Sequence, residues 1–399
     1  MNAYNLLKKI SVFALCASCG TCAFAAGFQV QEQGASNMGT ANAGAVTNAN
    51  ADATAAFWNS SAAAFIDMEE GKTLVNAAIT FVMPTLGLSN SNGEFDCAVN
   101  SYVPNFYMVH KFTDKFSATI SVTAPYGLES EYDSNWYGRP QGLRSYLMTC
   151  DINPGFSYKV TDWLSIGGGI SAQYADCNLT QYLGGQIDLR GHSWGVGGNV
   201  GFTVNYMEGG RFGFQWRSAV TQDLNGTFRF NGNPMSSISA SVDMPHTFNF
   251  GIYQRLPGDF NQFAVMLDYV YTTWSSFESL EVAPFPAVQE DWKDTSKIAF
   301  GIHYYPDWIE DLTLRLGVAY DESPVKNAEM RTVRIPCSDR LWFSCGVGYK
   351  WGCLSFDVAY SYIMCIGGSD INRTEYGLTV DGHYYGHIHV VSLQAGIEF

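Results

Sequence analysis

The residues best suited to chemistry are a few charged side chains set among small ones. Arg217, Asp268, His303, Arg315 and Asp357 each fall on the Gly/Ser/Thr-rich face of a segment in which polar and apolar residues alternate. Such a face is poorly solvated when it lines an interior, and a buried charge without a partner is costly. We therefore expect a network in which these groups pair with one another or anchor an inner segment. Binding of a ligand carboxylate by one of the two arginines is the alternative.

Neither a catalytic group nor a metal site is predicted. Serine and histidine occur without a spacing that pairs them, and no G-x-S-x-G motif is present. His387 and His389 share one strand face, but no third metal ligand is evident. The seven cysteines after residue 25 contain no C-x-x-C pair, which predicts neither a zinc site nor a complete disulfide framework. A disulfide between Cys337 and Cys365 stays open, and no cofactor is expected.

The composition limits the class of protein. The chain has 399 residues with a net charge of -15, and only 15% of its residues are charged, which argues against a nucleic-acid partner. Aromatic residues also make up 15% and glycine occurs 40 times, as is typical of many short strands with aromatic girdles. Residues 1–25 have the charged start, apolar stretch and A-x-A site of a secretory signal peptide, an N-terminal membrane anchor being the alternative.

The positions that carry the charged residues belong to a series of alternating segments. We count fourteen predicted strands, joined alternately by short turns and long loops. This pattern predicts an all-β fold, a 14-stranded antiparallel transmembrane barrel in the outer membrane of a Gram-negative bacterium. A soluble β-sandwich is disfavoured because the polar faces are Gly/Ser/Thr/Asn rather than Lys/Glu. The predicted strands are 72–88, 101–112, 116–125, 144–160, 163–176, 192–207, 211–228, 241–255, 261–273, 295–305, 311–321, 339–350, 353–363 and 386–399.

The stretch Ala26–Ile66 does not alternate. It is rich in Gly, Ala, Asn and Ser and holds two charges, Glu32 and Asp52. Small side chains let backbone pack closely, so we expect this stretch to lie inside the barrel as a plug. The expected organisation is a signal peptide at residues 1–25, a plug at 26–70 and a barrel at 71–399.

With these features in view, the chain resembles the FadL family of outer-membrane channels for hydrophobic compounds. The resemblance spans nearly the whole mature chain and rests on several short motifs in order. These are Ala26-Gly27-Phe28-Gln29, the plug, Tyr126-Gly127-Leu128, Trp216-Arg217-Ser218, Asp321-Glu322-Ser323-Pro324-Val325, Ile335-Pro336, Asp339-Arg340-Leu341-Trp342 and the terminal Phe399.

The resemblance implies passive transport of a lipophile. The ligand, a long-chain fatty acid or a neutral aromatic or aliphatic hydrocarbon, would be captured among the outer loops and held in a lumenal site. It would then leave sideways at the third strand as the plug rearranges. The family likeness further suggests that Phe28 acts as a displaceable stopper.

Two departures from the family pattern bear on the cargo. Asn59 is kept, but the proline that usually follows it is replaced by Ser60. Gln181 and the stretch around Gln289 stand where fatty-acid transporters carry basic groups. We therefore expect no basic group at the Gln181 position, which leaves neutral hydrocarbons open as the cargo.

A break in the wall is also predicted from the residues themselves. Pro125 cannot donate to a strand ladder, and Gly127 loosens it two residues on, with Tyr126 between them. An unpaired ladder is costly in lipid, so we expect a lateral window here; the alternative is that residue 125 only begins an outer loop.

Partners and the remaining alternatives follow from the barrel interpretation. We expect a monomer that contacts outer-membrane lipid and lipopolysaccharide, and that is recognised by the barrel-assembly machinery through Phe399. The alternative of another class is an outer-membrane lipid hydrolase. A general porin is disfavoured because residues 26–66 would obstruct a water channel.

Overall fold

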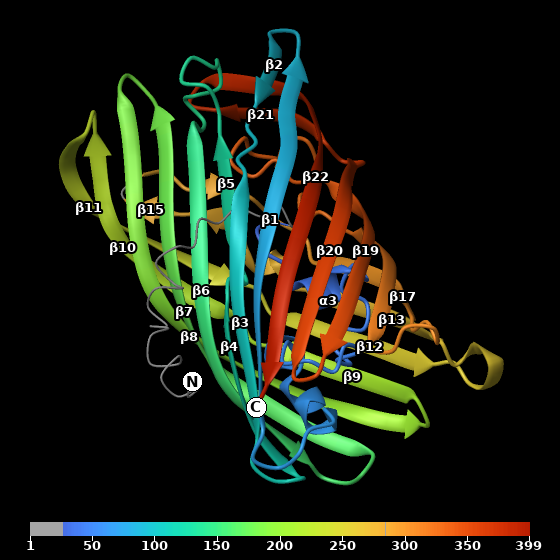
Figure 1. The fold of residues 1–399 in the computed structure, drawn as a ribbon. Coiled ribbons are helices and arrows are strands. Elements are labelled where there is room, and N and C mark those ends of the chain that lie inside the picture. Colours follow the sequence, from blue (N-terminus) through green and yellow to red (C-terminus); the bar gives the residue numbers. More distant parts are fainter. Residues whose placement is uncertain (1–26, 284) are drawn as a thin grey trace.

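The computed structural model describes residues 27–283 and 285–399, and the predicted signal peptide lies outside this range. Fourteen antiparallel strands form a closed barrel, as predicted. The barrel closes where β1 (Thr73–Asn90) pairs with β22 (Leu378–Glu398), seen side by side in Figure 1.

The remaining wall strands follow one another around the barrel in chain order, and three of them are interrupted by a break of two or three residues. They are β3 (Ser101–Lys111), β4 (Phe116–Thr123) continued by β5 (Gly127–Glu131), β6 (Arg144–Lys159), β7 (Leu164–Tyr182), β8 (Gln186–Met207), β9 (Gly210–Arg217) continued by β10 (Val220–Phe230), β11 (Asn233–Met244) continued by β12 (Thr247–Arg255), β13 (Phe263–Thr272), β17 (Thr295–Tyr304), β18 (Leu312–Asp321), β19 (Asp339–Trp351) and β20 (Leu354–Ile366).

Shorter elements lie in the lumen and at both ends of the barrel. The lumen holds the helices α3 (Ala35–Met38) and α4 (Ala55–Trp58) and a 3-10 helix, Ser60–Phe65. Among the described residues no helix is long and apolar enough to cross a membrane. The other short elements are β2 (Gly93–Asp96), β14 (Ser279–Leu280), β15 (Val282–Ala283), β16 (Val288–Gln289), β21 (Asp370–Glu375) and the 3-10 turns Gly258–Phe260 and Trp274–Ser276.

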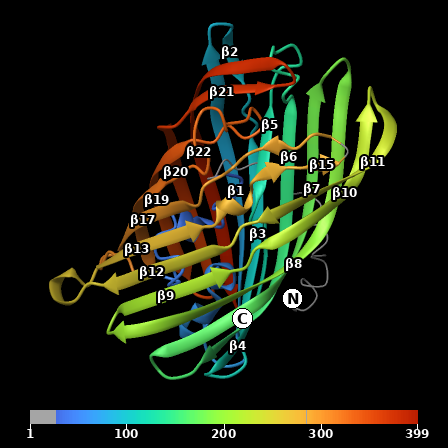
Figure 2. The same cartoon turned by 180° about the vertical axis from the view of Figure 1, so that it is seen from behind.

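Three of the predicted long loops are wrong. Residues 364–385 hold the end of β20, the whole of β21 and the start of β22. Residues 177–191 and 229–240 continue the ladders β7–β8 and β10–β11, which turn within 183–185 and 231–232. The reason is that these strands extend beyond the lipid belt, where neither face meets lipid and polar residues interrupt the in–out alternation that marks a membrane strand. The two hairpins project at the long-loop end (Figure 1), while the view from behind shows how far the opposite wall strands tilt (Figure 2).

The alternation sorts side chains between lipid and lumen. In β18, Leu316 and Val318 are 63% and 46% exposed, whereas the neighbouring Arg315 is 6% exposed. Because successive side chains of a strand point to opposite faces, the apolar set faces outward and the small and charged set faces the lumen.

Residues 27–66, here called the lumenal segment, fill the interior. The segment packs against the wall so closely that inward glycines are required. A Cβ added at Gly317 would overlap the backbone of Thr40, and one at Gly167 would overlap that of Ser61. The inward glycines of the strands and the small residues of the segment therefore fit each other, as backbone packed on backbone requires.

Candidate functional site

Phe28 is enclosed by four aromatic rings. Its centroid lies 4.6 Å from that of Trp274, 5.6 Å from Trp292, 5.8 Å from Phe277 and 6.1 Å from Tyr126. The side chain is 2% exposed, and three of the four contacts are edge-to-face, the geometry that aromatic pairs prefer. We call these four rings the aromatic box; it is an apolar site of the size of a ring, and Phe28 occupies it.

Gly27 brings the chain to the box. Its φ is +64°, a conformation that glycine adopts freely. A Cβ here would lie 2.7 Å from Trp292 and 2.9 Å from Trp274. Only glycine can therefore occupy position 27, directly before Phe28.

The backbone around Phe28 pairs with a break in the wall. β4 ends at Thr123 and β5 begins at Gly127. Across the break, Val30 N donates to Pro125 O at 2.8 Å, and Gly127 N donates to Phe28 O at 2.8 Å. Gln29 and Tyr126 face each other between these two bonds as an isolated antiparallel bridge. Residues 27–33, here called the arm, thus act as a short strand that supplies the hydrogen bonds missing from the wall.

The arm also covers the side of the break that faces β3. β3 pairs with β4 only from Phe106 onward, and the strand partner of β5 is β6. Gln33 Nε2 donates to Ala124 O at 3.0 Å, and Asn105 Nδ2 donates to Glu32 O at 3.3 Å. Since the arm bridges the outer half of β3 and the end of β4, its departure would leave a gap in the barrel wall.

Arg334 is buried next to Gln181, where the sequence predicts no basic group. Arg334 Nη2 donates to Gln181 Oε1 at 2.5 Å, and Nη1 lies 3.5 Å from both Ser145 Oγ and Thr180 O. Arg334 is 8% exposed, and within the described ranges no ion pair places a carboxylate on it. The expectation that this position lacks a basic group is wrong, because the loop between β18 and β19 brings a guanidinium from more than a hundred residues away.

A buried carboxyl group lies beside the aromatic box. The Trp292 indole Nε1–H donates to Glu290 Oε2 at 3.2 Å. Burial raises the pKa of Glu290 to about 8, against the opposing effect of the nearby Arg373. The loop before β17 therefore holds a carboxyl group that is largely neutral at pH 7 and touches a wall of the box.

Three of the five predicted lumenal charges take part in two separate ion pairs. Arg315 Nη1 lies 2.7 Å from Asp357 Oδ1, and its Nε donates to Asn50 Oδ1 at 2.9 Å. Arg217 Nη1 lies 3.3 Å from Asp151 Oδ2, and its Nη2 donates to Phe57 O at 3.0 Å. In both cases one side of the guanidinium holds a wall carboxylate and the other holds the lumenal segment.

The other two predicted charges take neutral partners. Asp268 accepts from the backbone N–H of Gly44 at 2.8 Å and of Val46 at 3.3 Å. His303 Nδ1 lies 3.0 Å from the Tyr305 hydroxyl. Asp268 therefore anchors the lumenal segment through its backbone, whereas His303 does not contact a charged partner through this nitrogen.

Asn59 fixes a turn of the lumenal segment without the family's proline. Its Nδ2 donates to Val46 O at 2.9 Å and to Thr203 Oγ1 at 3.1 Å, and its Oδ1 accepts from Ser61 Oγ at 2.7 Å. Asn59 caps the 3-10 helix that follows, because Oδ1 also accepts from Ser61 N at 3.3 Å. The Ser61 side chain thus takes part in holding the turn.

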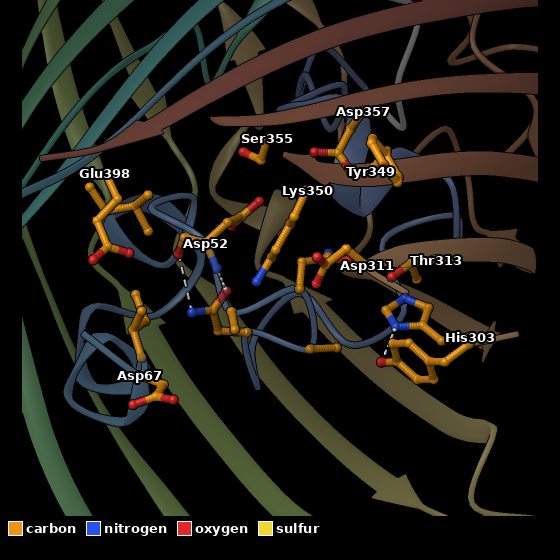
Figure 3. Close-up of a pocket in the computed structure, with 18 of the residues that line it drawn as sticks. Asp52, Asp67, His303, Asp311, Thr313, Tyr349, Lys350, Ser355, Asp357 and Glu398 are labelled. Carbon is orange, nitrogen blue, oxygen red and sulfur yellow. Dashed lines mark hydrogen bonds between the residues drawn. The ribbon is translucent and has the colours of Figure 1, made fainter. Parts of the chain in front are cut away.

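A cavity of about 360 Å³ opens at the short-turn end, between residues 48–52 and the wall. Figure 3 shows charged side chains around it, among them Asp52, Asp311, Lys350 and Glu398. A lining of this kind suits water rather than a lipophile. A much smaller space of about 30 Å³ at the other end, between the outer halves of β7, β8, β10 and β11, is lined by Leu179, Leu189, Leu224 and Ile238.

The described residues form neither a metal site nor the disulfide between Cys337 and Cys365. The described residues contain no group of three or more His, Cys, Asp or Glu side chains that could hold a metal ion. Cys337 and Cys365 are free thiols, so the disulfide left open by the sequence is not formed.

Several of these residues were missed in the sequence. Asp151 follows the same parity as Asn153 and Ser157 in a predicted strand, so alternation could have placed it in the lumen. Trp274, Phe277, Trp292 and Arg334 lie in long loops, where no periodicity assigns a side chain to a face.

Comparison with known proteins agrees with this geometry. A family model described as "Outer membrane protein transport protein (OMPP1/FadL/TodX)" matches residues 16–399. The long-chain fatty acid transport protein of Escherichia coli O6:H1 is 29% identical over 419 residues, covering 91% of this chain and 92% of its own. Outer membrane protein P1 of Haemophilus influenzae is 30% identical over 315 residues, covering 66% of each chain.

Solved structures share the fold. A Pseudomonas aeruginosa FadL homologue superposes with a TM-score of 0.84 at 21% identity, covering 93% of this chain and 99% of its own. The Ralstonia pickettii toluene transporter TbuX superposes with a TM-score of 0.64 at 16% identity, covering 90% and 97%. The Escherichia coli and Ralstonia pickettii proteins are named as transporters. The chain belongs to the OMPP1/FadL/TodX family of outer-membrane transport proteins.

Proposed function

We propose that this outer-membrane barrel passes long-chain fatty acids from the outer surface to a lateral opening between β3 and β5. The observation that carries the proposal is the double role of the arm. The same few residues place Phe28 in the aromatic box and close the wall at Pro125. A ligand that takes the place of Phe28 would therefore also remove the residues that close the gap.

The route begins at the long-loop end. The apolar side chains between the outer hairpins, Leu179 and Ile238 among them, offer a first contact for an acyl chain. The aromatic box is the inner site, and the break at Pro125, Tyr126 and Gly127 is the exit. In this proposal the lumenal segment is a plug that stays anchored by Arg217, Arg315, Asp268 and Asn59 while only the arm moves.

Arg334 favours a carboxylate over a hydrocarbon. It is buried, and its hydrogen-bond acceptors are the neutral oxygens of Gln181, Ser145 and Thr180. Arginine keeps its charge even when buried and binds carboxylates in a bidentate geometry. A fatty-acid head group is thus the missing anionic partner, with Gln181 as a second donor through its amide nitrogen.

A disulfide across the break tests the movement of the arm. Gln29 and Tyr126 form a pair that lies between two hydrogen-bonded pairs, and such partners have Cα atoms about 4.5 Å apart, within disulfide range. We expect the oxidised variant Gln29→Cys/Tyr126→Cys to take up labelled oleate at under a tenth of its rate after reduction. Each single variant and the parent chain, which has seven cysteines of its own, serve as redox controls. Equal uptake in both redox states would refute displacement of the arm.

Neutral aromatic or aliphatic hydrocarbons are the second candidate, because the box itself is uncharged. Binding of oleate and of toluene to the purified protein separates the two. With Arg334→Gln, we expect oleate binding to weaken about tenfold and toluene binding to stay unchanged. An equal effect on both ligands would mean that Arg334 serves the structure of the loop rather than a head group.

A further inference from the structure

The start of the arm is hydrogen-bonded to the thiol of Cys337, which lies far from it in the sequence. The backbone N–H of Gly27 donates to Cys337 Sγ at 3.4 Å. Cys337 lies in the loop between β18 and β19, and it is 2% exposed. The sulfur is therefore covered by the residue that must move if Phe28 leaves the aromatic box.

A cation lies against the same sulfur. Arg340 Nη2 donates to Cys337 Sγ at 3.4 Å, and Arg340 is 2% exposed. The other terminal nitrogen, Nη1, has no hydrogen-bond partner among the described residues. The unused N–H groups of this buried guanidinium can bind an anionic group of an incoming molecule next to the sulfur.

We propose that Cys337 is a ligand-gated modification site, exposed when the arm leaves and then open to capping by a low-molecular-weight disulfide that carries carboxylates. This inference rests on the proposed displacement of the arm. The Cys337 thiolate attacks one sulfur of the disulfide, the S–S bond of the reagent breaks, and a new S–S bond forms to Cys337. The leaving thiolate takes up the proton that Cys337 released.

The consequence of capping follows from the packing of Gly27. Gly27 already sits against Trp274 and Trp292, with no room for an added Cβ. An adduct on the sulfur beneath it would occupy the place of Gly27. The arm could not return, Phe28 would stay out of the box, and the gap at Pro125 would stay unfilled.

Alkylation of the wild-type protein tests the gating. Trypsin releases Cys337 in the peptide Ile335–Arg340, which contains no other cysteine. We expect N-ethylmaleimide to label this peptide at least tenfold faster with saturating oleate than without it. Cys353, exposed at the turn between β19 and β20, should label at the same rate in both samples.

Binding of radiolabelled oleate is measured in the same samples, so that two failures can be told apart. Bound oleate with an unchanged rate at Cys337 would overturn this inference and leave the transport proposal standing. Absence of oleate binding would overturn the proposed cargo instead. In the oxidised Gln29→Cys/Tyr126→Cys variant, we expect the rate at Cys337 to stay slow with oleate present.

Two variants test the chemistry. Oxidised glutathione added with oleate should leave the wild-type protein leaky to oleate until dithiothreitol is added, and Cys337→Ser, which keeps an acceptor for Gly27, should show no such effect. A leak of the same size in Cys337→Ser would refute the site. Arg340→Gln should slow the reaction with oxidised glutathione at least fivefold more than that with neutral N-ethylmaleimide. Equal slowing of both would refute the role given to Arg340.

Discussion

Phe28 meets Trp274 edge-on, with the ring centroids 4.6 Å apart, and this contact joins the arm to a loop nearly 250 residues away. The contact is apolar and reversible, since an aromatic pair contributes only about 0.5–1.5 kcal/mol beyond its buried area. In the proposed route a lipophile takes the place of this contact.

Replacing Phe28 with alanine should strengthen ligand binding. The ligand would no longer compete with a resident ring, so we expect oleate affinity to rise about tenfold, equivalent to ~1.4 kcal/mol. Equilibrium binding to the purified barrel measures this. Phe260→Ala, at an exposed turn, is the matched control and should bind as the parent does. An unchanged affinity in Phe28→Ala would show that the ligand does not enter the box.

The pH dependence of stability should report on Glu290. Its pKa is about 8 in the folded protein against 4.5 for an unperturbed glutamate. The folded state therefore keeps a proton that the unfolded state has lost, so stability falls as the pH rises from about 4.5 to about 8 and is constant above that. Glu290→Gln should flatten part of this slope in thermal unfolding scans. The exposed Glu281→Gln should leave the slope unchanged.

Breaking either lumenal ion pair should loosen the lumenal segment. Asp151→Asn or Asp357→Asn leaves a buried guanidinium without its carboxylate, which costs about 3–5 kcal/mol. We expect a lower unfolding midpoint in denaturant and faster proteolysis within residues 27–66.

The exposed pair Lys159–Asp162 provides the control for these changes. The two side chains lie 3.5 Å apart, with the Asp162 side chain fully exposed. Asp162→Asn should leave both measurements unchanged, because solvent screens such pairs. A similar loss in Asp162→Asn would mean that the lumenal pairs carry no special weight.

Restoring a strand former at the break should slow transport. Pro125→Val adds a backbone N–H and Gly127→Val stiffens the extended chain, so we expect the double variant to take up oleate at least fivefold more slowly. Pro234→Val, in the outer hairpin formed by β10 and β11, is the control. Normal uptake in the double variant would argue against exit at this position.

Much of the wall was predictable because the residues of a membrane strand alternate between apolar side chains that face lipid and small or polar side chains that face the lumen. Leu316, Val318 and their small neighbours alternate because one face meets lipid and the other meets the lumen. This alternation is lost beyond the lipid belt, which is why the ends of β7, β8, β10 and β11 at the long-loop end were predicted as loops. The break at Pro125 was visible for a local reason, since proline lacks a backbone donor.

The arrangement around the arm was decided only by the tertiary structure. Phe28, Trp274 and Trp292 meet because the barrel brings the arm next to a loop that is distant in the sequence. Arg334 reaches Gln181, and Cys337 reaches Gly27, in the same way. Spacing along a sequence constrains neighbours within a strand or a helix, but contacts between loops depend on how the closed barrel places their ends. The sequence alone therefore predicted the barrel, the small-residue segment and the strand break at Pro125. Only the closed barrel determined that Phe28 occupies the aromatic box and that Arg334 lies beside Gln181.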